Sequence, residues 1–322
     1  MKTFRKCPSL DIVVPCYNET EAFPFCLAEL RNIINRLKDK ELISSQSGIL
    51  FVDDGSKDDT WRLISESCQG HDNVKGIKLS RNKGHQVALI AGLGKSEADI
   101  VVSIDADLQD DTNAIEDMVV KYHEGFDVVY GVRNNRQSDT FLKKNTALLF
   151  YKLMSFMGVN QIQNHADFRL LSRVALNALL DYREENIYIR GLIPMLGFPS
   201  TQVFYSRSSR VAGESKYPLK KMLSLAVEGI TSLTITPLRM IAVFGLFIAA
   251  LSTLAGIYAI TEKLLGRTVD GWASVMIGVF FLGGVQMLSL GVIGEYIGKI
   301  YVETKRRPKF FISEEKGYND VK

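Results

Sequence analysis

Two long apolar stretches near the end of the chain constrain its fold more than any other feature. The first, from about Leu238 to Ile260, carries no charge after Arg239, and the second, from about Trp272 to Gly294, carries none. Each is close to the roughly 20 residues that a helix needs to cross the hydrocarbon core of a bilayer. The sequence therefore predicts a two-helix transmembrane anchor within residues 237–300.

Lysine and arginine concentrate on the flanks of this anchor. The loop between the helices holds only Lys263 and Arg267, whereas the flanks hold Lys220, Lys221, Lys305, Arg306, Arg307 and Lys309. Cytoplasmic flanks are enriched in such residues. We therefore expect a multi-pass protein of the inner (cell) membrane with both termini in the cytoplasm. No apolar run near the N-terminus is long enough for a signal peptide, so the polar part is expected to stay in the cytoplasm.

The charge balance argues against a nucleic-acid partner. Lysine and arginine number 39 against 36 aspartates and glutamates. The cations gather beside the apolar stretches, which suits an anionic membrane surface better than a nucleic acid. The four cysteines show no zinc-binding spacing, and we expect reduced thiols.

The first half of the chain alternates β-rich runs with helical patterns. We predict strands at Leu10–Pro15, Gly48–Val52, Val74–Leu79, Ile100–Ile104 and Asp127–Gly131. We predict helices at Glu21–Lys40, Asp58–Cys68, Gly84–Lys95 and Asn113–His123, with Thr20 as the first N-cap. This alternation predicts an α/β, Rossmann-like domain: an open parallel sheet with helices on both faces.

Ligands of such sheets bind at the carboxyl ends of the strands. That rule points to three segments that directly follow predicted strands: Pro15–Glu19, Asp53–Ser56 and Asp105–Gln109.

Two lysine-bearing amphipathic helices are expected at Phe141–Met157 and from Pro218 to about Ile235. Such helices lie in a membrane interface, or form part of a soluble core. The predicted layout is a cytoplasmic domain over residues 1–217, a juxtamembrane amphipathic helix over 218–236, the two-helix anchor over 237–300 and a basic cytoplasmic tail over 301–322.

The sharpest local pattern is the run Asp105-Ala106-Asp107-Leu108-Gln109. Two carboxylates one residue apart can converge on a hard cation such as Mg²⁺ or Mn²⁺, which shares oxygen ligands with substrate phosphates. The amide oxygen of Gln109 is a further candidate ligand. Such a metal would neutralise charge on a departing nucleoside diphosphate. An acidic surface turn is the structural alternative.

Three further segments are predicted turns or helix starts whose residues are also candidates for ligand contact. Asp53–Ser56 predicts a tight turn with Gly55 at positive φ, and its carboxylates are candidates for contact with a nucleoside or the metal. Pro15–Glu19 predicts either a strand-to-helix turn or a base and ribose pocket in which Tyr17 supplies an aromatic face. Arg81–His85 opens a predicted helix, where cations and backbone N–H groups suit phosphates. Surface solvation is the alternative for its cations.

Taken together, these segments resemble the family-two inverting glycosyltransferases of the GT-A fold. Ala166–Leu170 resembles the family's Gly-Asp-Phe-Arg-Leu signature, and Ala212–Tyr217 resembles its Ala-Gly-Glu-Ser-Lys-Tyr hairpin. Phe281–Met287, Gly294–Gly298 and Glu303–Pro308 resemble the tail of bactoprenol glucosyl transferases. The resemblance covers nearly the whole chain, and motifs in this order are specific.

The resemblance implies transfer of a sugar, with glucose as the leading candidate, from a UDP-sugar donor to polyisoprenyl (undecaprenyl) phosphate. On the donor side, the positions that would hold the metal and diphosphate are Asp105, Asp107 and Gln109. The positions that would hold the nucleoside are Pro15, Tyr17, Glu19 and Asp54. Arg81 is the phosphate-binding candidate of its segment.

On the acceptor side, the resemblance makes Asp167 the catalytic carboxylate. Arg210, Ser215 and Lys216, joined by Arg133, would grip the lipid phosphate or the donor diphosphate. The second pKa of a phosphate monoester is about 6, so the acceptor is mostly dianionic at neutral pH and does not demand a strong base. We hypothesise that Asp167 orients the acceptor, or the arginine that binds it. A buried ion pair with Arg169 or Arg173 is the structural alternative.

The sequence departs from the family pattern in places. Ala166 stands where the family more often has glycine, and would be strained if that position needs positive φ. Asp110-Asp111 stands where the family commonly has Asp-Pro after the metal motif, which is expected to alter a helix start. His85 and His165 are not assigned acid–base roles, because a lone histidine is more often structural.

Three alternatives remain beside this interpretation. A processive polysaccharide synthase would carry a Gln-x-x-Arg-Trp motif, and neither Trp61 nor Trp272 lies in one. A dolichol-phosphate-mannose-type synthase would use GDP-mannose. A non-catalytic membrane scaffold is disfavoured by the intact acidic and basic positions. Interpretation of the chain as an enzyme implies a flippase partner. The small residues of the second apolar stretch indicate a homo-oligomer. N-acetylglucosamine and galactose stay open as the sugar.

Overall fold

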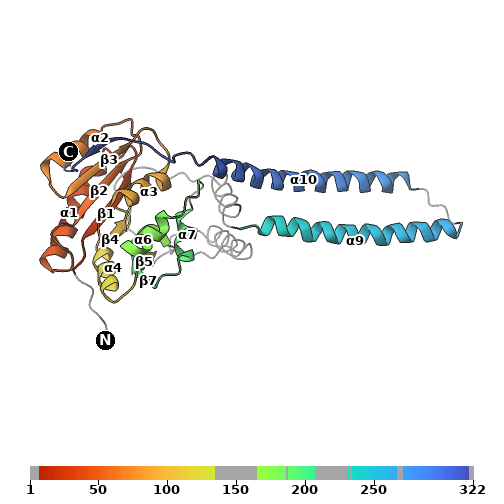
Figure 1. Cartoon of the computed structure of the whole chain (residues 1–322), viewed down its shortest axis with the longest axis horizontal. Helices are drawn as coiled ribbons and strands as arrows, with labels where there is room; N and C mark the ends of the chain where they lie inside the picture. Colours follow the sequence, from red (N-terminus) through yellow and green to blue (C-terminus); the bar gives the residue numbers. More distant parts are fainter. Residues whose placement is uncertain are drawn as a thin grey trace. The chain divides into compact units, whose positions relative to one another are not determined.

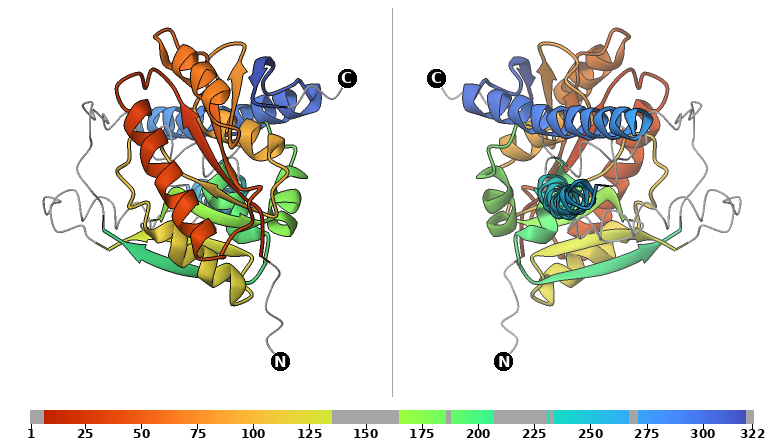
Figure 2. Two further views of the ribbon diagram at one scale, coloured as in Figure 1. Left: turned by 90° about the vertical axis from the view of Figure 1, so that its left-hand side faces the viewer. Right: turned by 90° about the vertical axis from the view of Figure 1, so that its right-hand side faces the viewer.

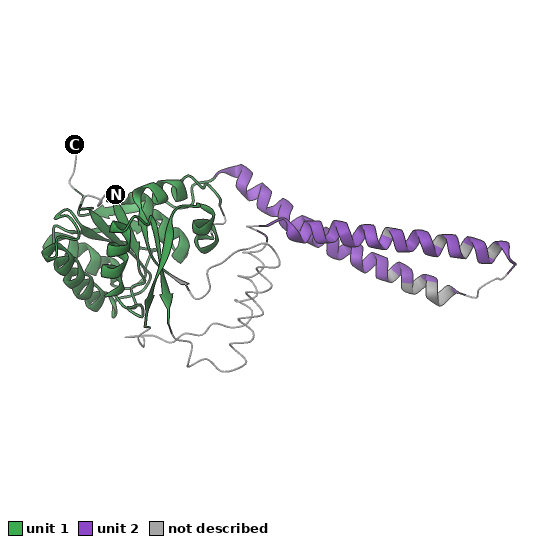
Figure 3. Ribbon diagram, turned by 90° about the horizontal axis from the view of Figure 1, so that it is seen from below, with its two compact units in different colours: residues 1–151, 160–218, 307–322 green, residues 152–159, 219–306 purple. Residues whose placement is uncertain are grey.

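The structure is a computed structural model and describes residues 7–134, 165–185, 188–206, 231, 234–266 and 271–318. The chain forms two compact units (Figure 3). The first comprises residues 1–151, 160–218 and 307–322, and the second comprises residues 152–159 and 219–306.

An eight-stranded sheet forms the framework of the first unit (Figure 1). The strand order is β7-β5-β6-β4-β1-β2-β3-β8. Its strands are β1 (Leu10–Cys16), β2 (Gly48–Asp53), β3 (Val74–Leu79), β4 (Ile100–Ser103), β5 (Val128–Arg133), β6 (His165–Ser172), β7 (Ser200–Tyr205) and β8 (Ile312–Lys316). The five strands predicted from the sequence are all present, and the α/β class is confirmed. Parallel pairing joins β1 to β2 and β4, and β2 to β3.

Two strands make the sheet mixed, so the all-parallel prediction is wrong in part. β6 runs antiparallel between β4 and β5, and β8 runs antiparallel beside β3. Asp167 and Arg169 interrupt the apolar run of β6, which hides it in a pattern search. β8 has the sequence Ile-Ser-Glu-Glu-Lys, and short charged strands are typical of sheet edges. Part of the tail predicted over residues 301–322 is therefore a strand of this sheet.

Helices cover both faces of the sheet, as predicted (Figure 2). On one face lie α1 (Phe23–Asp39), α2 (Thr60–Gly70) and α4 (Ala114–His123), around a core that includes Ile12, Ile34 and Phe51. On the other lie α3 (His85–Lys95) and α6 (Arg173–Leu180). The short helix α7 spans Ile189–Met195. Central strands covered on both faces are apolar throughout, which explains the continuous runs of β1, β2 and β4.

Gly92 lets α3 lie close to the sheet. A Cβ at this position would come within 2.5 Å of the Val13 side chain and 2.6 Å of the Val52 side chain. α3 therefore packs directly on β1 and β2. Its first residue, His85, is held at the edge where the parallel strands end.

The start of α1 differs from the prediction. Its N-cap is Ala22, with a proline in the first turn, so Thr20 is not the cap. The Thr20 hydroxyl instead donates to Asp58 Oδ2 at 2.5 Å. This bond ties the loop after β1 to the loop after β2.

The second unit contains two long helices, α9 (Thr236–Leu264) and α10 (Trp272–Lys305). Thr236–Glu262, with a mean hydropathy of 2.3, and Phe281–Lys305, with 1.2, are long and apolar enough to cross a membrane. α10 continues well beyond the predicted end of its apolar stretch. Glu295, expected at the end of that stretch, therefore lies inside the second candidate span.

Several predictions concern residues outside the described ranges. These are the amphipathic helix at 141–157, nearly all of the one at 218–236, and the candidate residues Arg210, Ser215 and Lys216.

Candidate active site

The loops that follow β1 and β2 meet at the carboxyl edge of the sheet. The backbone N–H of Asp54 donates to the Cys16 carbonyl at 2.9 Å, and that of Asn18 donates to Ser56 Oγ at 2.9 Å. Gly55 has φ +68°, as predicted, and a Cβ there would lie 2.7 Å from the backbone of Arg81. The loop after β3 is therefore packed against the loop after β2.

Two residues in the loops after β1 and β4 have left-handed backbone. Asn18 has φ 55° in the loop after β1, and Leu108 has φ 51° in the loop after β4. A left-handed conformation costs a bulky residue such as leucine about 1–2 kcal/mol. Residues of this kind cluster at ligand sites, where the surrounding structure holds them in place. Both loops were selected from the sequence as ligand-binding candidates.

The four nucleoside candidates differ in how much surface they present. Pro15 is buried within β1, and Glu19 is half-buried. The Tyr17 side chain is 41% exposed, which leaves its ring accessible for stacking on a base. Their contact with a nucleoside stays a prediction.

Asp54 is buried and organises the start of α3. Its two carboxylate oxygens accept from the backbone N–H groups of Lys83 at 2.7 Å and Gly84 at 2.8 Å. Burial raises the pKa of this carboxyl, against the opposing effect of the two hydrogen bonds. Asp54 therefore fixes the loop that carries Arg81, which is exposed. Any contact of Asp54 with a nucleoside would be additional to this structural role.

Asp105, Asp107 and Gln109 follow β4 directly. Asp107 Oδ1 accepts from the backbone N–H of Gln109 at 3.2 Å, and the Gln109 side chain is buried. No group of three or more histidine, cysteine, aspartate or glutamate side chains among the described residues is arranged to hold a metal ion. A cation at this loop would therefore take its two carboxylates and complete its shell with amide, water or substrate oxygens.

The electrostatics of this loop fit a hard cation. Burial raises the pKa of Asp105, and neighbouring carboxylates raise it further, against the effect of His85. The raised pKa reflects burial first and the neighbouring carboxylates second, and a divalent cation bound at the loop would counter both effects. The donor set of carboxylate and amide oxygens also suits Mg²⁺ or Mn²⁺.

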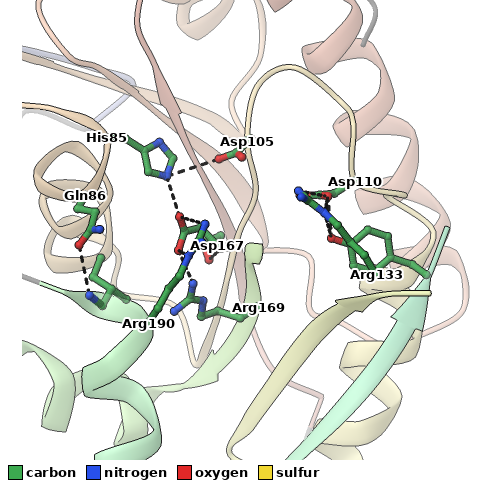
Figure 4. Close-up of polar contacts among 11 residues, drawn as sticks. His85, Gln86, Asp105, Asp110, Arg133, Asp167, Arg169 and Arg190 are labelled. Carbon is green, nitrogen blue, oxygen red and sulfur yellow. Dashed lines mark hydrogen bonds and ion pairs between the residues drawn. The ribbon is translucent and has the colours of Figure 1, made fainter. Parts of the chain in front are cut away.

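Asp167 lies at the centre of a charged cluster (Figure 4). Arg190 binds it with two hydrogen bonds, from Nε to Oδ1 at 3.1 Å and from Nη2 to Oδ2 at 3.0 Å. Arg169 Nη2 donates to Oδ1 at 2.5 Å. His85 Nε2 lies 3.5 Å from Asp167 Oδ2 and 3.5 Å from Asp105 Oδ1. His85 thus lies between the candidate metal loop and the candidate catalytic carboxylate.

The cluster keeps Asp167 ionised. Burial alone would raise the pKa of this carboxyl, but the hydrogen bond from His85 and the charges of Arg169 and Arg190 outweigh it. The pKa of Asp167 therefore lies well below its usual range, and the group is a weak base. Burial lowers the pKa of His85, yet its two carboxylate neighbours raise it on balance.

The ion pair named from the sequence as the structural alternative for Asp167 is present with one of the two arginines. Arg169 makes it, whereas Arg173 donates to the Ala98 carbonyl. Ala166 lies in the extended backbone of β6, so the strain expected from a positive φ does not arise.

Arg133 belongs to a second cluster, apart from Asp167 (Figure 4). Its Nε and Nη2 donate to Asp110 Oδ1 at 3.0 and 2.8 Å, and the Tyr205 hydroxyl donates to the same oxygen at 2.6 Å. Asp110 is buried, and this cluster joins the loop after β4 to the ends of β5 and β7. The neighbouring Asp111 affects the start of α4 as predicted, since its Oδ1 accepts from the backbone N–H of Asn113 at 3.0 Å.

Sequence reasoning missed four members of these clusters, of which Tyr205 in β7 lies in no motif that was singled out. Arg190 comes from α7, and no spacing rule links it to Asp167, because the fold alone brings them together. His85 was set aside, although it stands in the helix-start segment that selected Arg81. Asp110 was considered only for its effect on a helix start.

Two family models together match most of this chain. A family model described as glycosyl transferase family 2 matches residues 11–180, more than half of the chain. A second model, described as the GtrB C-terminal hairpin, matches residues 236–300, which span α9 and most of α10.

Curated relatives match along almost the whole chain. The chain is 52% identical over 307 residues to the Bacillus subtilis glycosyltransferase YkoT, covering 95% of this chain and 91% of the relative. It is 39% identical over 309 residues to the bactoprenol glucosyl transferase of Shigella phage SfV, covering 95% and 99%. It is 37% identical over 309 residues to the prophage bactoprenol glucosyl transferase homolog of Escherichia coli K12, with the same coverage.

Among solved structures, the chain is similar to glucosyl-3-phosphoglycerate synthase from Mycobacterium tuberculosis. The TM-score is 0.46 at 19% identity, covering 70% of this chain and 79% of the other. The family model and the curated relatives carry the assignment: this chain is a glycosyltransferase that belongs to glycosyl transferase family 2 and has its GT-A α/β fold.

Proposed function

We propose that this enzyme transfers a sugar from a UDP-sugar to a polyisoprenyl phosphate, with undecaprenyl phosphate as the lipid and glucose as the leading sugar. The product would be a polyisoprenyl-phosphate-linked sugar used to modify cell-surface glycans, with UDP as the second product. The observation that carries the proposal is the position of His85, 3.5 Å from both Asp105 and Asp167. It joins a donor-side acidic loop to a carboxylate held by two arginines. Relatives named bactoprenol glucosyl transferase support the lipid acceptor.

Asp105, Asp107 and Gln109 are proposed to hold Mg²⁺ or Mn²⁺. When bound, the cation would neutralise charge that develops on the departing diphosphate. Tyr17, Glu19 and Asp54 with the buried Pro15 would form the uridine pocket. Arg81, in the loop that Asp54 fixes, is exposed and suited to phosphate. Arg210, Ser215 and Lys216 stay acceptor-site predictions from the family motif.

Asp167 is proposed to orient the acceptor side rather than to take a proton. Its pKa is held low, against the effect of burial, by the hydrogen bond from His85 and the charges of Arg169 and Arg190. A phosphate acceptor is already largely ionised at neutral pH, so inversion at the sugar carbon needs no strong base. Arg133 forms an ion pair with Asp110. We propose that Arg133 supports the loop proposed to hold the metal and also binds phosphate.

The membrane location is part of the proposal. α9 and α10 are long and apolar enough to cross a bilayer twice, which would leave the catalytic unit and both termini in the cytoplasm. A sugar attached there would need a flippase to reach the outer surface. A flippase partner and a homo-oligomer remain predictions from the sequence.

The donor is the least constrained part of the proposal. UDP-N-acetylglucosamine, UDP-galactose and GDP-mannose are the alternatives, because charge and spacing do not encode the configuration of one hydroxyl. The relatives named bactoprenol glucosyl transferase support glucose as the sugar, and the sequence resemblance of residues 281–308 implies a UDP-sugar.

The test is sugar transfer by the detergent-solubilised protein. Undecaprenyl phosphate, Mg²⁺ or Mn²⁺ and a panel of labelled UDP- and GDP-sugars would be supplied, and the lipid extracted. We expect label in the lipid from one UDP-sugar, and loss of roughly 100-fold or more in Asp107→Asn, as expected when electrostatic stabilisation of a leaving group is removed. Folded protein that binds nucleotide but labels no lipid with any donor would contradict the proposal.

A further inference from the structure

We propose that Arg190 binds the phosphate of the acceptor lipid, and that Asp167 serves the reaction by holding the Arg190 guanidinium in place. This inference rests on the proposed function and names the group on this chain that would receive the acceptor.

The charge of the cluster favours an anionic ligand. Two guanidinium cations, Arg169 and Arg190, surround one carboxylate, Asp167, so the three side chains carry one net positive charge. An approaching phosphate would therefore meet a cationic site although an aspartate lies at its centre. Charges that are partly removed from water interact more strongly with an incoming anion than fully solvated ones.

Exposure separates the two arginines. The Arg169 side chain is 1% exposed, which leaves it no surface on which to meet a ligand. The Arg190 side chain is 42% exposed, although its carboxylate partner is 10% exposed. Arg190 is therefore the cation of this pair that can be reached from solvent.

The hydrogen bonds leave donors available on Arg190. The pair with Asp167 uses Nε and Nη2. A guanidinium carries further N–H donors in a rigid plane, and that plane suits bidentate binding of phosphate. Asp167 holds one edge of the plane, so the remaining N–H groups have a fixed direction. A fixed donor loses less entropy on binding than a mobile one.

The fold places Arg190 beside the rest of the site. The backbone N–H of Ile189 donates to Gln86 Oε1 at 3.3 Å, which ties the start of α7 to the start of α3 (Figure 4). His85 precedes Gln86 and contacts both Asp105 and Asp167. A phosphate on Arg190 would therefore lie close to the loop proposed to hold the donor diphosphate, as direct transfer between the two requires.

The phosphate that Arg190 meets has two possible sources, the acceptor monophosphate and the donor diphosphate. Binding of farnesyl phosphate, a soluble short-chain polyisoprenyl phosphate, and binding of UDP would be measured separately on the full-length protein. Farnesol, which lacks the phosphate, isolates the contribution of the anion. Arg183→Gln removes the same charge at an exposed position outside the cluster and serves as the matched control.

We expect Arg190→Gln to weaken farnesyl phosphate binding by about tenfold or more, as for a lost charge-assisted hydrogen bond, and to abolish the preference over farnesol. The affinity of Arg190→Lys for farnesyl phosphate should lie between those of wild type and Arg190→Gln, because lysine keeps the charge and lacks the planar guanidinium. UDP binding should stay within about twofold in each variant, which also reports that the protein is folded. Unchanged farnesyl phosphate binding, or an equal loss of UDP binding, would overturn the assignment.

A separate measurement tests whether Asp167 acts through Arg190. If Asp167 acts through Arg190, then Asp167→Asn should raise the KM for the lipid. The variant that carries both Asp167→Asn and Arg190→Gln should then have a KM no higher than that of Arg190→Gln alone. If the loss in the double variant instead equals the product of the two single losses, Asp167 does not act through Arg190. Failure of the proposed function would look different from failure of this inference. A wild-type protein that binds farnesyl phosphate through Arg190 but transfers no sugar would confirm the phosphate site and refute sugar transfer to this acceptor.

Discussion

At the residue scale, the surroundings of Asp167 decide which step this carboxylate can assist. A general base needs a pKa near the working pH, and two arginines with a histidine hold the pKa of Asp167 well below that. The same partners make it an effective anchor for cations. On this basis we propose a role in orientation.

Replacement of Asp167 by asparagine tests that role through pH. A group that only orients the acceptor side is missed equally in every ionisation state of the phosphate, so the variant should lose activity by a similar factor from about pH 5.5 to about pH 8.5. The pH profile of kcat/KM for the lipid in wild type and Asp167→Asn checks this. A loss below about pH 6 that recovers above about pH 7, where the phosphate is dianionic, would mean that the carboxylate itself takes the proton.

Sequence reasoning identified the acidic and loop residues of the site better than its arginines. Asp105 and Asp167 lie in short motifs with fixed spacing, so their neighbourhood was predictable. Arg190 lies on a separate helix, and only the packing of α7 against the start of α3 brings it to Asp167. Arg133 was expected beside phosphate, yet its donors are directed to Asp110.

At the element scale, β8 connects the end of the chain to the site. The Phe311 carbonyl, just before β8, accepts from the backbone N–H of Ser80 at 2.9 Å, directly before the loop that carries Arg81. Lys95 of α3 pairs with Glu315 of β8 at 2.8 Å. The strand therefore supports a candidate phosphate-binding loop from outside. Its charged sequence gave no strand signal, because edge strands need apolar residues least.

Gly317→Val should weaken the docking of β8. Gly317 has φ +78°, and a Cβ there would lie 2.5 Å from the Val74 carbonyl oxygen. We expect a loss of roughly 1–3 kcal/mol in the free energy of unfolding of the first unit, as for other steric clashes. Thermal unfolding followed by circular dichroism measures it.

Gly125→Val is the matched control, because Gly125 has φ +109° with no atom within 4 Å of its Cβ position. Both variants meet the cost of a positive φ, and only Gly317→Val adds the clash. Equal losses in the two variants would show that β8 contributes no specific packing.

At the scale of the whole molecule, the sheet constrains the path of the chain. Strands β1–β7 precede α9, and β8 follows α10, yet all belong to one sheet. The chain must therefore leave the first unit and return to it. If both helices cross the membrane, the two ends are on the same side, as the lysine and arginine distribution independently predicts.

Cysteine labelling tests this topology in intact cells. Thr268→Cys, between α9 and α10, should react with a membrane-impermeant maleimide from outside. Ser313→Cys in β8, where the side chain is exposed to solvent, should react only after permeabilisation. The reverse pattern, or labelling of both positions from outside, would refute the hairpin arrangement.

The most direct test of the central claim is the nucleotide released when the lipid becomes labelled. Transfer of a sugar onto a lipid phosphate breaks the bond between the sugar carbon and the diphosphate, so the account predicts one UDP for each labelled lipid, in a single turnover with undecaprenyl phosphate and a UDP-sugar. UMP in place of UDP would show transfer of a sugar phosphate. UDP with free sugar and no labelled lipid would show hydrolysis, and either result would contradict the account.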